Sequence, residues 1–389
     1  MNATYLVRGI RSALHKQPLL RSAYAALRPA YWALRAEYRA LRAVYQPHVD
    51  RVGTAGASRD PLDPWRMYRF IDTTKHADKL KSGSSYRPLT LQCETVNVCN
   101  NLCVICAYPQ EARQRAVMPM EVFEKVLHDY SQMGGGYMSM TPVTGDILLD
   151  KYLLQRLERI RCYPRIREIG VTTNAVMLDR FTDDEVRTIV NAFGKLQISI
   201  YGLDEEEYVA MTKRNTYHRA IDAVRRILAV RQHAVFLSFR LLKPHARKTI
   251  DDWVLATFGY PVGINSVMTG DYANFVALDT AKPLPFGSTW AQEPPKKTQC
   301  LIPLLAVQIS SNGSVAFCAC VGGVEGLVLG NIKDHTLLEL YNTPKVRALW
   351  NWAEAGVPDA CSRCTFYAPL ENVRGDPTIL DNPFAITGA

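Results

Sequence analysis

Three cysteines lie close together on one short stretch of the chain. Cys99, Cys103 and Cys106 have the spacing Cys-x3-Cys-x2-Cys. Three thiolates on a tight loop suit three irons of a [4Fe–4S] cube and leave the fourth iron without a protein ligand. A structural zinc site requires four protein ligands, and Cys93, on an expected strand upstream, has the wrong spacing to be the fourth. The stretch therefore favours an iron–sulfur cluster with one open coordination position, and a zinc site is the alternative.

The segment around these cysteines alternates short β-rich runs with helical stretches. Gly134-Gly135-Gly136 is a stop signal at the end of the first of these helices. Six strand–helix units in succession predict a parallel sheet with right-handed crossovers. Because a closed barrel needs eight units, we expect an α/β fold with an open, partial (β/α)6 TIM-like barrel, whose active site lies at the C-terminal ends of the strands. The predicted strands are Leu89–Cys93, Tyr137–Thr141, Glu168–Thr172, Lys195–Ile200, Val235–Leu241 and Ile264–Met268, and the predicted helices between them are Pro119–Met133, Lys151–Arg161, Asp183–Ala192, His218–Arg231 and Arg247–Thr257.

The cysteine loop follows directly on the first predicted strand, and in this context it resembles the signature of radical S-adenosylmethionine (SAM) enzymes. In that family the open iron binds the amino and carboxylate groups of SAM, and one electron from the reduced cluster breaks the sulfonium bond. The resulting 5′-deoxyadenosyl radical abstracts a hydrogen atom from an unactivated carbon. The family usually has an aromatic residue just before the last cysteine, where this chain has Ile105. The resemblance implies SAM, a [4Fe–4S] cluster and a flavodoxin- or ferredoxin-type electron donor.

Further segments resemble SAM-binding segments of the family, each after the expected strand. Thr144-Gly145-Asp146 is similar to the Gly-Gly-Glu segment that holds the SAM ammonium group, and Thr173-Asn174 to a Thr-Asn-Gly turn in which Ala175 replaces the glycine. Ser199 lies in a segment similar to Ser-x-Asp-Gly, whose serine is near the SAM ribose or carboxylate. The residues that the resemblance implies as SAM contacts are Ile105, Tyr108, Thr144, Gly145, Asp146, Thr173, Asn174, Ser199 and Arg214, the last as a partner of the carboxylate.

A second group of cysteines lies near the C-terminus and resembles the SPASM/twitch extension of radical SAM enzymes. The full SPASM form has further cysteines after its final Cys-x2-Cys pair, whereas this chain has none after Cys364. The resemblance is therefore to the shortened twitch form, with one auxiliary [4Fe–4S] cluster held by Cys300, Cys318, Cys361 and Cys364. Four thiolates would saturate such a cluster, which suits electron transfer, and a zinc knuckle is the alternative. Cys320 is surplus and could replace Cys318 or donate a hydrogen atom.

The auxiliary cluster bears on the expected reaction, because it could accept an electron after hydrogen abstraction and so permit a two-electron oxidation. The cysteine spacing is close to that of a radical SAM dehydrogenase acting on an aminocyclitol. The resemblance thus implies an oxidoreductase that dehydrogenates a small hydroxylated or sugar-like metabolite. The alternative within the family is cross-linking or epimerisation of a ribosomally made peptide, with Cys320 as the hydrogen donor. Arg240, Lys243 and His245, at the end of the fifth strand, are candidates for catalysis or for structural roles, and Arg240 is the one put forward.

The N-terminal residues carry most of the net charge of +9. Residues 1–51 contain nine Lys and Arg but two acids, which supply +7. Tyr24, Tyr31, Tyr38 and Tyr45 recur every seven residues, and Leu and Arg follow the first three of them at fixed offsets. This pattern predicts a helical arm that packs on the body, forms a homodimer or contacts an anionic membrane surface. Because the rest of the chain is close to neutral, no specific nucleic-acid partner is expected.

The patterns divide the chain into a basic helical arm (residues 1–50), a linker (51–87), the partial barrel (88–290) and the auxiliary-cluster domain with its tail (291–389). Ten cysteines that lie mainly in metal-ligand groups indicate the reducing cytoplasm rather than a disulfide framework. Outside the two groups, Cys93 and Cys162 are expected to be small buried hydrophobic residues. A function of another class, a non-catalytic metal-binding scaffold with a basic arm, would contain zinc instead of iron.

Overall fold

The computed structural model describes residues 87–110, 112–272, 280–296, 298–319 and 326–370, together with the single residues 72, 74, 373 and 375. The predictions made for the arm over residues 1–50, for nearly all of the linker and for Cys320 lie outside the described residues. Within the described ranges, every helix is too short or too polar to cross a bilayer.

Six parallel strands form the centre of the fold. The sheet has the order β11-β10-β9-β1-β2-β3-β4-β5-β6, so the first six strands lie side by side in chain order and β6 is an open edge. This arrangement confirms the α/β fold class and the partial barrel expected from six strand–helix units. Each predicted strand agrees with an observed one to within about two residues at either end. The observed strands are β1 (Thr90–Cys93), β2 (Gly136–Ser139), β3 (Ile166–Thr173), β4 (Lys195–Ile200), β5 (Val235–Leu241) and β6 (Gly263–Thr269).

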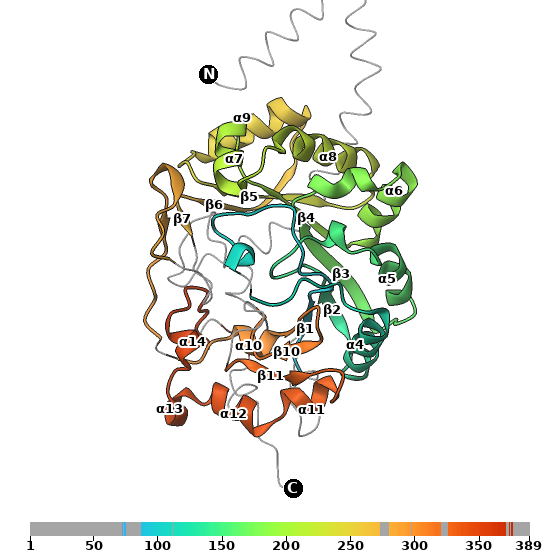
Figure 1. Cartoon of the computed structure of the whole chain (residues 1–389), viewed down its shortest axis with the longest axis vertical. Coiled ribbons are helices and arrows are strands. Elements are labelled where there is room, and N and C mark those ends of the chain that lie inside the picture. Colours follow the sequence, from blue (N-terminus) through green and yellow to red (C-terminus); the bar gives the residue numbers. More distant parts are fainter. Residues whose placement is uncertain are drawn as a thin grey trace, which may run out of the picture. The chain divides into compact units, whose positions relative to one another are not determined.

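Helices cover the outer face of the curved sheet, and the cysteine loop lies on its inner side (Figure 1). The predicted helices are α4 (Met120–Gln132), α5 (Leu153–Ile160), α6 (Asp183–Ala192), α8 (Tyr217–Val230) and α9 (Arg247–Phe258). An additional helix, α7 (Glu205–Thr212), follows β4 and was not predicted. It begins at Asp204, whose carboxylate accepts a hydrogen bond of 2.7 Å from the main-chain N–H of Glu207. Three acidic residues in its first turn favour the positive end of the helix dipole.

The chain passes from α4 into β2 through the three glycines that were predicted to stop the helix. Gly134, Gly135 and Gly136 have φ values of 94°, 60° and 118°. A Cβ atom on Gly135 would lie 2.1 Å from the carbonyl oxygen of Arg165. The same carbonyl accepts a hydrogen bond of 2.8 Å from the N–H of Gly136. Residue 135 must therefore be glycine for β2 to meet β3 in this register.

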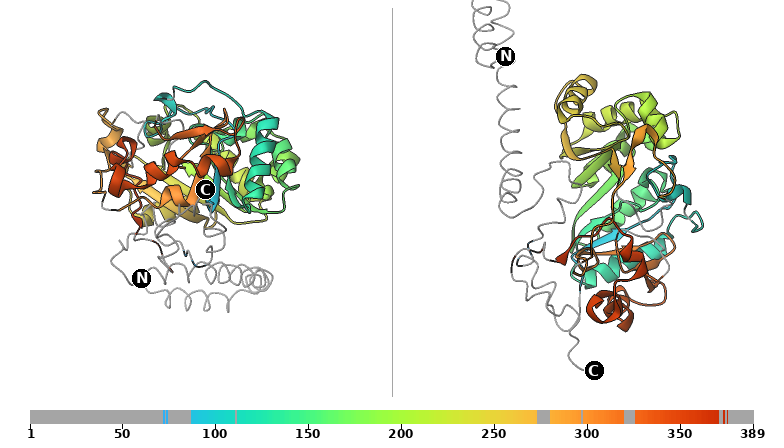
Figure 2. Two further views of the ribbon diagram at one scale, coloured as in Figure 1. Left: turned by 90° about the horizontal axis from the view of Figure 1, so that it is seen from below. Right: turned by 90° about the vertical axis from the view of Figure 1, so that its left-hand side faces the viewer.

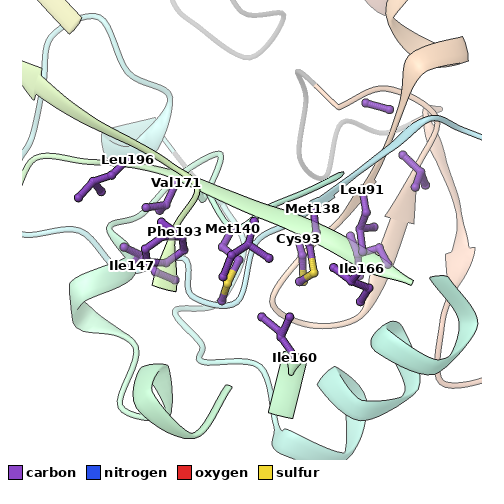
Figure 3. Packing of buried hydrophobic residues seen from close by; sticks show 14 of the residues in the cluster. Leu91, Cys93, Met138, Met140, Ile147, Ile160, Ile166, Val171, Phe193 and Leu196 are labelled. Atoms are coloured by element: carbon purple, nitrogen blue, oxygen red, sulfur yellow. The ribbon is translucent and has the colours of Figure 1, made fainter. Parts of the chain in front are cut away.

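The main core lies between the sheet and its helices. Figure 3 shows Cys93 of β1 beside Met138 of β2, with Ile160 of α5 packed close to them. Cys93 is fully buried, as predicted. The prediction for Cys162 is wrong, because this cysteine follows the end of α5 and is exposed.

The C-terminal segment extends the same sheet, which the sequence did not predict. β9 (Ala306–Ile309) pairs in parallel with β1, and β10 (Ser314–Ala316) pairs antiparallel with both β9 and β11 (Val328–Asn331). The paired positions include Thr90 with Ala306 and Cys93 with Ile309. β9 therefore continues the sheet beyond β1, on the side opposite to β2.

Three short helices follow β11. These are α11 (Leu337–Tyr341), α12 (Pro344–Trp350) and α13 (Trp352–Ala355). α12 is separate from α11 because Pro344 has no N–H to continue α11 and instead starts α12 behind the capping residue Thr343. These helices lie at the β11 end of the sheet, far from α7–α9 (Figure 1 and Figure 2). The remaining short elements are α10 (Ile302–Leu305), α14 (Asp359–Ser362), β7 (Asp271–Tyr272) and β8 (Thr289–Trp290).

Candidate active site

The cysteine loop leaves the C-terminal end of β1 and is fastened to the end of α7. The main-chain N–H groups of Leu102 and Val104 donate hydrogen bonds of 2.9 Å to the carbonyl oxygens of Thr212 and Met211, respectively. The loop is thus positioned by a helix that the sequence pattern did not reveal. Because α7 ends there, its last carbonyl groups have no partner within the helix and are available to the loop.

The three thiols of the loop influence one another electrostatically, which places them close together. Burial raises the pKa of Cys99 to about 12 and the pKa of Cys103 well above its ordinary value. The neighbouring cysteines raise both values further. Main-chain N–H groups reach two of the sulfurs, from Asn101 to Cys99 at 3.5 Å and from Tyr108 to Cys106 at 3.4 Å. Buried thiols surrounded by N–H donors fit a site in which thiolates bind metal.

Asp146 joins the segment after β2 to the turn after β3. Its carboxylate is buried and accepts hydrogen bonds from the N–H of Leu148 at 3.0 Å, the hydroxyl of Thr173 at 2.9 Å and the N–H of Asn174 at 2.8 Å. Burial raises the pKa of Asp146, and these hydrogen bonds oppose that rise. Its own N–H donates to the carbonyl of Val98 at 2.8 Å, so the segment also supports the start of the cysteine loop.

The turn after β3 reaches the cysteine loop directly. The side-chain amide of Asn174 donates to the side-chain oxygen of Asn100 at 3.1 Å and to the sulfur of Cys99 at 3.7 Å. The next residue, Ala175, has φ of +62°, a left-handed conformation that favours glycine. This backbone accords with the resemblance to a Thr-Asn-Gly turn. Arg214 approaches the loop from the opposite side, where its Nε donates to the carbonyl of Asn100 at 3.2 Å.

Glu94, the residue after β1, is a buried hub that sequence reasoning missed. Its carboxylate is fully buried and forms an ion pair of 2.6 Å with Arg113 of the cysteine loop. It also accepts hydrogen bonds from the main-chain N–H groups of Val143 at 3.1 Å, Thr144 at 3.2 Å and Ser311 at 3.4 Å. An acidic residue directly after a buried strand is the signal in the sequence that could have identified it.

Gly145 lies where two segments cross. A Cβ atom on this residue would be 2.5 Å from the carbonyl oxygen of Val96 and 3.2 Å from the Cα of Asn97. The adjacent Thr144 accepts a hydrogen bond of 3.0 Å from Arg113. The Thr144–Asp146 segment is therefore held tightly against the chain that leads from β1 to the first cysteine.

A positive charge lies on β5, at the inner side of the barrel. Arg240 donates a hydrogen bond of 2.9 Å to the hydroxyl of Ser199 on β4, and within the described ranges it forms no ion pair. Its charge lowers the pKa values of Cys103, Tyr201 and Tyr272, although burial dominates and raises all three. The guanidinium therefore lies near Cys103, Tyr201 and Tyr272.

The other two candidates on this strand end have different partners. Lys243 pairs with Glu206 at 2.7 Å, and His245 pairs with the buried Glu207 at 3.1 Å. Both therefore connect the end of β5 to α7. Of the three residues, Arg240 alone forms no ion pair with another described residue, so its positive charge could pair with a bound group.

Apolar side chains pack against the cysteine loop. Cys103 and Ile105 pack in one buried cluster with Met211, Leu242, Tyr272 and Leu284. Tyr108 stands apart from this cluster, where the guanidinium of Arg115 lies 4.0 Å from the centre of its ring. The loop thus has apolar side chains around Cys103 and Ile105 and a cationic side chain, Arg115, beside Tyr108. Both kinds of contact suit a charged cofactor with apolar parts.

The four thiols of the second cysteine group also lie together. Burial raises the pKa values of Cys300, Cys361 and Cys364 to about 12, and the charge of Cys318 is the next largest cause of the rise for each. No cysteine of the first loop is among the causes of these shifts, and the two groups lie on different parts of the chain.

The connection of the strands explains this separation. Cys300 precedes α10 and β9, and Cys318 follows the antiparallel β10, which returns toward the start of β9. The loop with Cys99 instead follows the end of β1, which is parallel to β9. The two groups therefore follow opposite ends of the β9–β1 pair.

Comparison with known proteins supports the interpretation of both cysteine groups. The family model of the radical SAM superfamily matches residues 93–244, and that of the SPASM iron–sulfur cluster-binding domain matches residues 300–365. A radical SAM domain implies a [4Fe–4S] cluster and SAM, and a SPASM domain implies auxiliary iron–sulfur clusters.

Curated relatives match parts of the chain at low sequence identity. GTP 3′,8-cyclase of Petrotoga mobilis is 22% identical over 197 residues, which are 47% of this chain and 59% of that protein. GTP 3′,8-cyclase of Thermodesulfovibrio yellowstonii is 29% identical over 128 residues, which are 32% of this chain and 38% of that protein. The chain therefore spans about half the length of the curated relatives that it matches.

Among solved structures, Streptococcus suis SuiB bound to the precursor peptide SuiA is similar in fold. The TM-score is 0.52 at 14% sequence identity, and the match covers 84% of this chain and 82% of that one. At this level of identity the similarity is one of fold. The chain thus contains a radical SAM domain, followed by a C-terminal iron–sulfur cluster-binding domain of the SPASM type.

Proposed function

We propose that this enzyme oxidises a small hydroxylated substrate by two electrons, using one cluster to generate a radical and the other to accept an electron. The observation that carries the proposal is the presence of two groups of neighbouring, partly buried thiols, one of three and one of four. Three thiolates leave one iron open to SAM, whereas four saturate a cluster and suit it to electron transfer.

Cys99, Cys103 and Cys106 would hold the first cluster. When bound, this cluster supplies the electron that cleaves SAM to methionine and the 5′-deoxyadenosyl radical, which takes a hydrogen atom from the substrate. Asn174 and the N–H groups of Asn101 and Tyr108 stabilise the thiolate form of the ligands. The apolar cluster around Ile105 excludes water from the loop and so protects a radical from side reactions.

Arg240 and Ser199 would bind the carboxylate of SAM. A guanidinium recognises a carboxylate with paired N–H donors, and this one has only the hydroxyl of Ser199 as a hydrogen-bond partner in the described part of the chain. Thr144, Gly145, Asp146, Thr173, Asn174, Arg214 and Tyr108 remain proposed SAM contacts. Of these, Asp146 acts by shaping the turn that presents Asn174.

Cys300, Cys318, Cys361 and Cys364 would hold the auxiliary cluster. The substrate radical left after hydrogen abstraction loses a second electron and a proton to form a carbonyl group. The auxiliary cluster is the proposed acceptor of that electron, and a flavodoxin- or ferredoxin-type protein is the proposed external donor for the first cluster. Each turnover would then convert one C–H and one O–H bond of the substrate into a carbonyl group.

The test is an anaerobic assay of the iron-loaded, dithionite-reduced enzyme with SAM. We expect about eight irons per chain, the sum of two four-iron clusters, and 5′-deoxyadenosine detected by mass spectrometry. Replacement of Cys99, Cys103 and Cys106 by alanine should abolish 5′-deoxyadenosine and leave about four irons. Cys162→Ala is the matched control, because this cysteine is exposed and outside both groups.

Two outcomes would overturn the proposal. An enzyme with about eight irons that forms no 5′-deoxyadenosine would contradict SAM cleavage. Formation of 5′-deoxyadenosine with a cross-linked or epimerised peptide, and with no loss of two hydrogens from a hydroxylated substrate, would contradict the oxidation and establish peptide modification instead.

A further inference from the structure

Lys296 extends its side chain to the second cysteine group. Its Nζ donates hydrogen bonds to the main-chain carbonyl of Cys364 at 2.6 Å and to that of Pro294 at 3.0 Å. The ammonium also lies 5.1 Å from the centre of the Tyr367 ring. The side chain is half-buried, so its charge is only partly exposed to water.

None of these partners carries a negative charge. No carboxylate of the described residues lies within ion-pair distance of Lys296, and Glu293, the acidic residue whose charge it senses, is exposed on the same segment. Burial lowers the pKa of Lys296, while the cysteines Cys364, Cys300 and Cys361 raise it. Withdrawal of an ammonium group from water without a counter-charge is costly. The cysteine group offers the missing charge, because four thiolates around a cluster are anionic.

The Tyr367 ring that the ammonium of Lys296 contacts is itself held in place by two neighbours. The hydroxyl of Tyr367 accepts a hydrogen bond from the N–H of Thr298 at 3.1 Å and donates one to its carbonyl at 2.8 Å. The ring of Trp352 stacks on Tyr367 with 6.1 Å between centroids. The aromatic ring under the ammonium is therefore held in place, and the cation–π contact adds to the attraction of the site for the charge.

We propose that Lys296 is the counter-ion of the auxiliary cluster and raises its reduction potential. The inference rests on the proposed function, in which the second cysteine group holds that cluster. Reduction adds one negative charge to an anionic cluster, and a cation close by in a low-dielectric site stabilises the reduced form more than the oxidised form. A higher potential makes the cluster a better acceptor of the electron that leaves the substrate.

The experiment is a redox titration of the auxiliary cluster, followed by electron paramagnetic resonance. It uses the full-length chain with Cys99, Cys103 and Cys106 replaced by alanine, so that the signal of the first cluster is absent. We expect Lys296→Met to change the reduction equilibrium tenfold or more toward the oxidised form, a drop of about 59 mV for a one-electron couple. Lys296→Gln, which keeps a polar group for the two carbonyls, should give a similar drop, and Lys296→Arg should retain the parent potential.

A matched control is Lys345→Met. Lys345 also donates to a main-chain carbonyl, that of Val328, but its side chain is exposed and its charge is not among the causes that shift the pKa values of Cys300, Cys361 and Cys364. Its potential should equal that of the parent. Unchanged potentials in both neutral Lys296 variants that carry a full cluster would overturn the inference alone. A parent chain that binds no four-iron cluster would overturn the proposed ligand set, and the inference with it.

Discussion

The carboxylate of Glu94 accepts a hydrogen bond of 3.4 Å from the main-chain N–H of Ser311, across 217 positions of sequence. Glu94 follows β1 and Ser311 follows β9, so the bond lies where these two parallel strands end. The same carboxylate pairs with Arg113 of the cysteine loop. One buried charge therefore links the loop of the first cluster to the strand that begins the C-terminal domain.

Glu94→Gln should destabilise the protein by about 3 kcal/mol. The amide keeps the shape of the side chain but presents an N–H group to donors, and it removes the buried negative charge with which Arg113 pairs. Because Thr144 is also held by this carboxylate, affinity for SAM should fall as well. Denaturant unfolding of the iron-free protein measures the first effect, and equilibrium binding of SAM to the loaded protein measures the second.

The matched control for Glu94 is Glu124→Gln. Glu124 also pairs with an arginine, Arg159, but both side chains are substantially exposed. Exposed ion pairs contribute about 0–1 kcal/mol, so this variant should be close to the wild type in stability and SAM binding. Equal losses in the two variants would contradict the special role of the buried carboxylate.

A second buried ion pair supports the outer layer of the fold. Arg156 of α5 is fully buried, and its Nε donates to Asp150 at 2.7 Å. Arg156→Met should lower the free energy of unfolding by about 3–5 kcal/mol, because it leaves the carboxylate of Asp150 buried without its partner. The double variant Arg156→Met/Asp150→Asn should recover part of the loss, since the uncompensated charge is then removed. Chemical denaturation of the three proteins measures these differences, and a double variant less stable than Arg156→Met would contradict the interpretation.

The sequence predicted the six parallel strands and five of the helices because these elements show their periodicity locally. It also identified both cysteine groups, since metal-ligand spacing is a short-range signal. The helix α7 was not predicted because its apolar side chains do not lie on one face of the helix. Its last carbonyl groups instead contact the cysteine loop, which is distant in the sequence.

The features that the sequence did not reveal depend on contacts between distant segments. The pairing of β9 with β1 brings together Leu91 and Val307. No local sequence pattern indicates which strand will be the parallel partner of another. The contacts of Glu94 could not be predicted for the same reason, since its partners come from three segments that are distant in the sequence. The exposure of Cys162 likewise follows from where α5 ends on the surface, and not from the residue type.

Arg240→Met should weaken SAM binding by about tenfold or more, since a hydrogen bond to a charged group contributes about 1.5–3 kcal/mol. The loss should largely disappear with a SAM analogue that lacks the carboxylate, because that analogue has nothing for the guanidinium to bind. Lys243→Met is the control, as Lys243 is engaged with Glu206 and Asp204. Anaerobic equilibrium binding to the iron-loaded protein gives all the affinities. If Arg240→Met weakens both ligands equally, Arg240 contacts another part of SAM or shapes the pocket indirectly.

The crossing at Gly145 gives the last prediction. A methyl group there would overlap the carbonyl of Val96, which is 2.5 Å from the Cβ position, and this backbone atom cannot move without displacing the start of the cysteine loop. Gly145→Ala should therefore cost about 1–3 kcal/mol in stability and reduce iron loading of the first cluster, while the four irons of the second are retained.

Gly134→Ala separates this steric effect from a general intolerance of alanine. Gly134 has φ of +94° but no atom within 4 Å of its Cβ position, so its cost is backbone strain alone, about 1–2 kcal/mol. Since Gly134 lies at the end of α4 that leads into β2, far along the chain from the cysteine loop, iron loading should be normal in this variant. Iron analysis of both variants next to their unfolding curves makes the comparison. If the two lose stability to the same extent and both keep full iron, the crossing at Gly145 does not position the cluster loop.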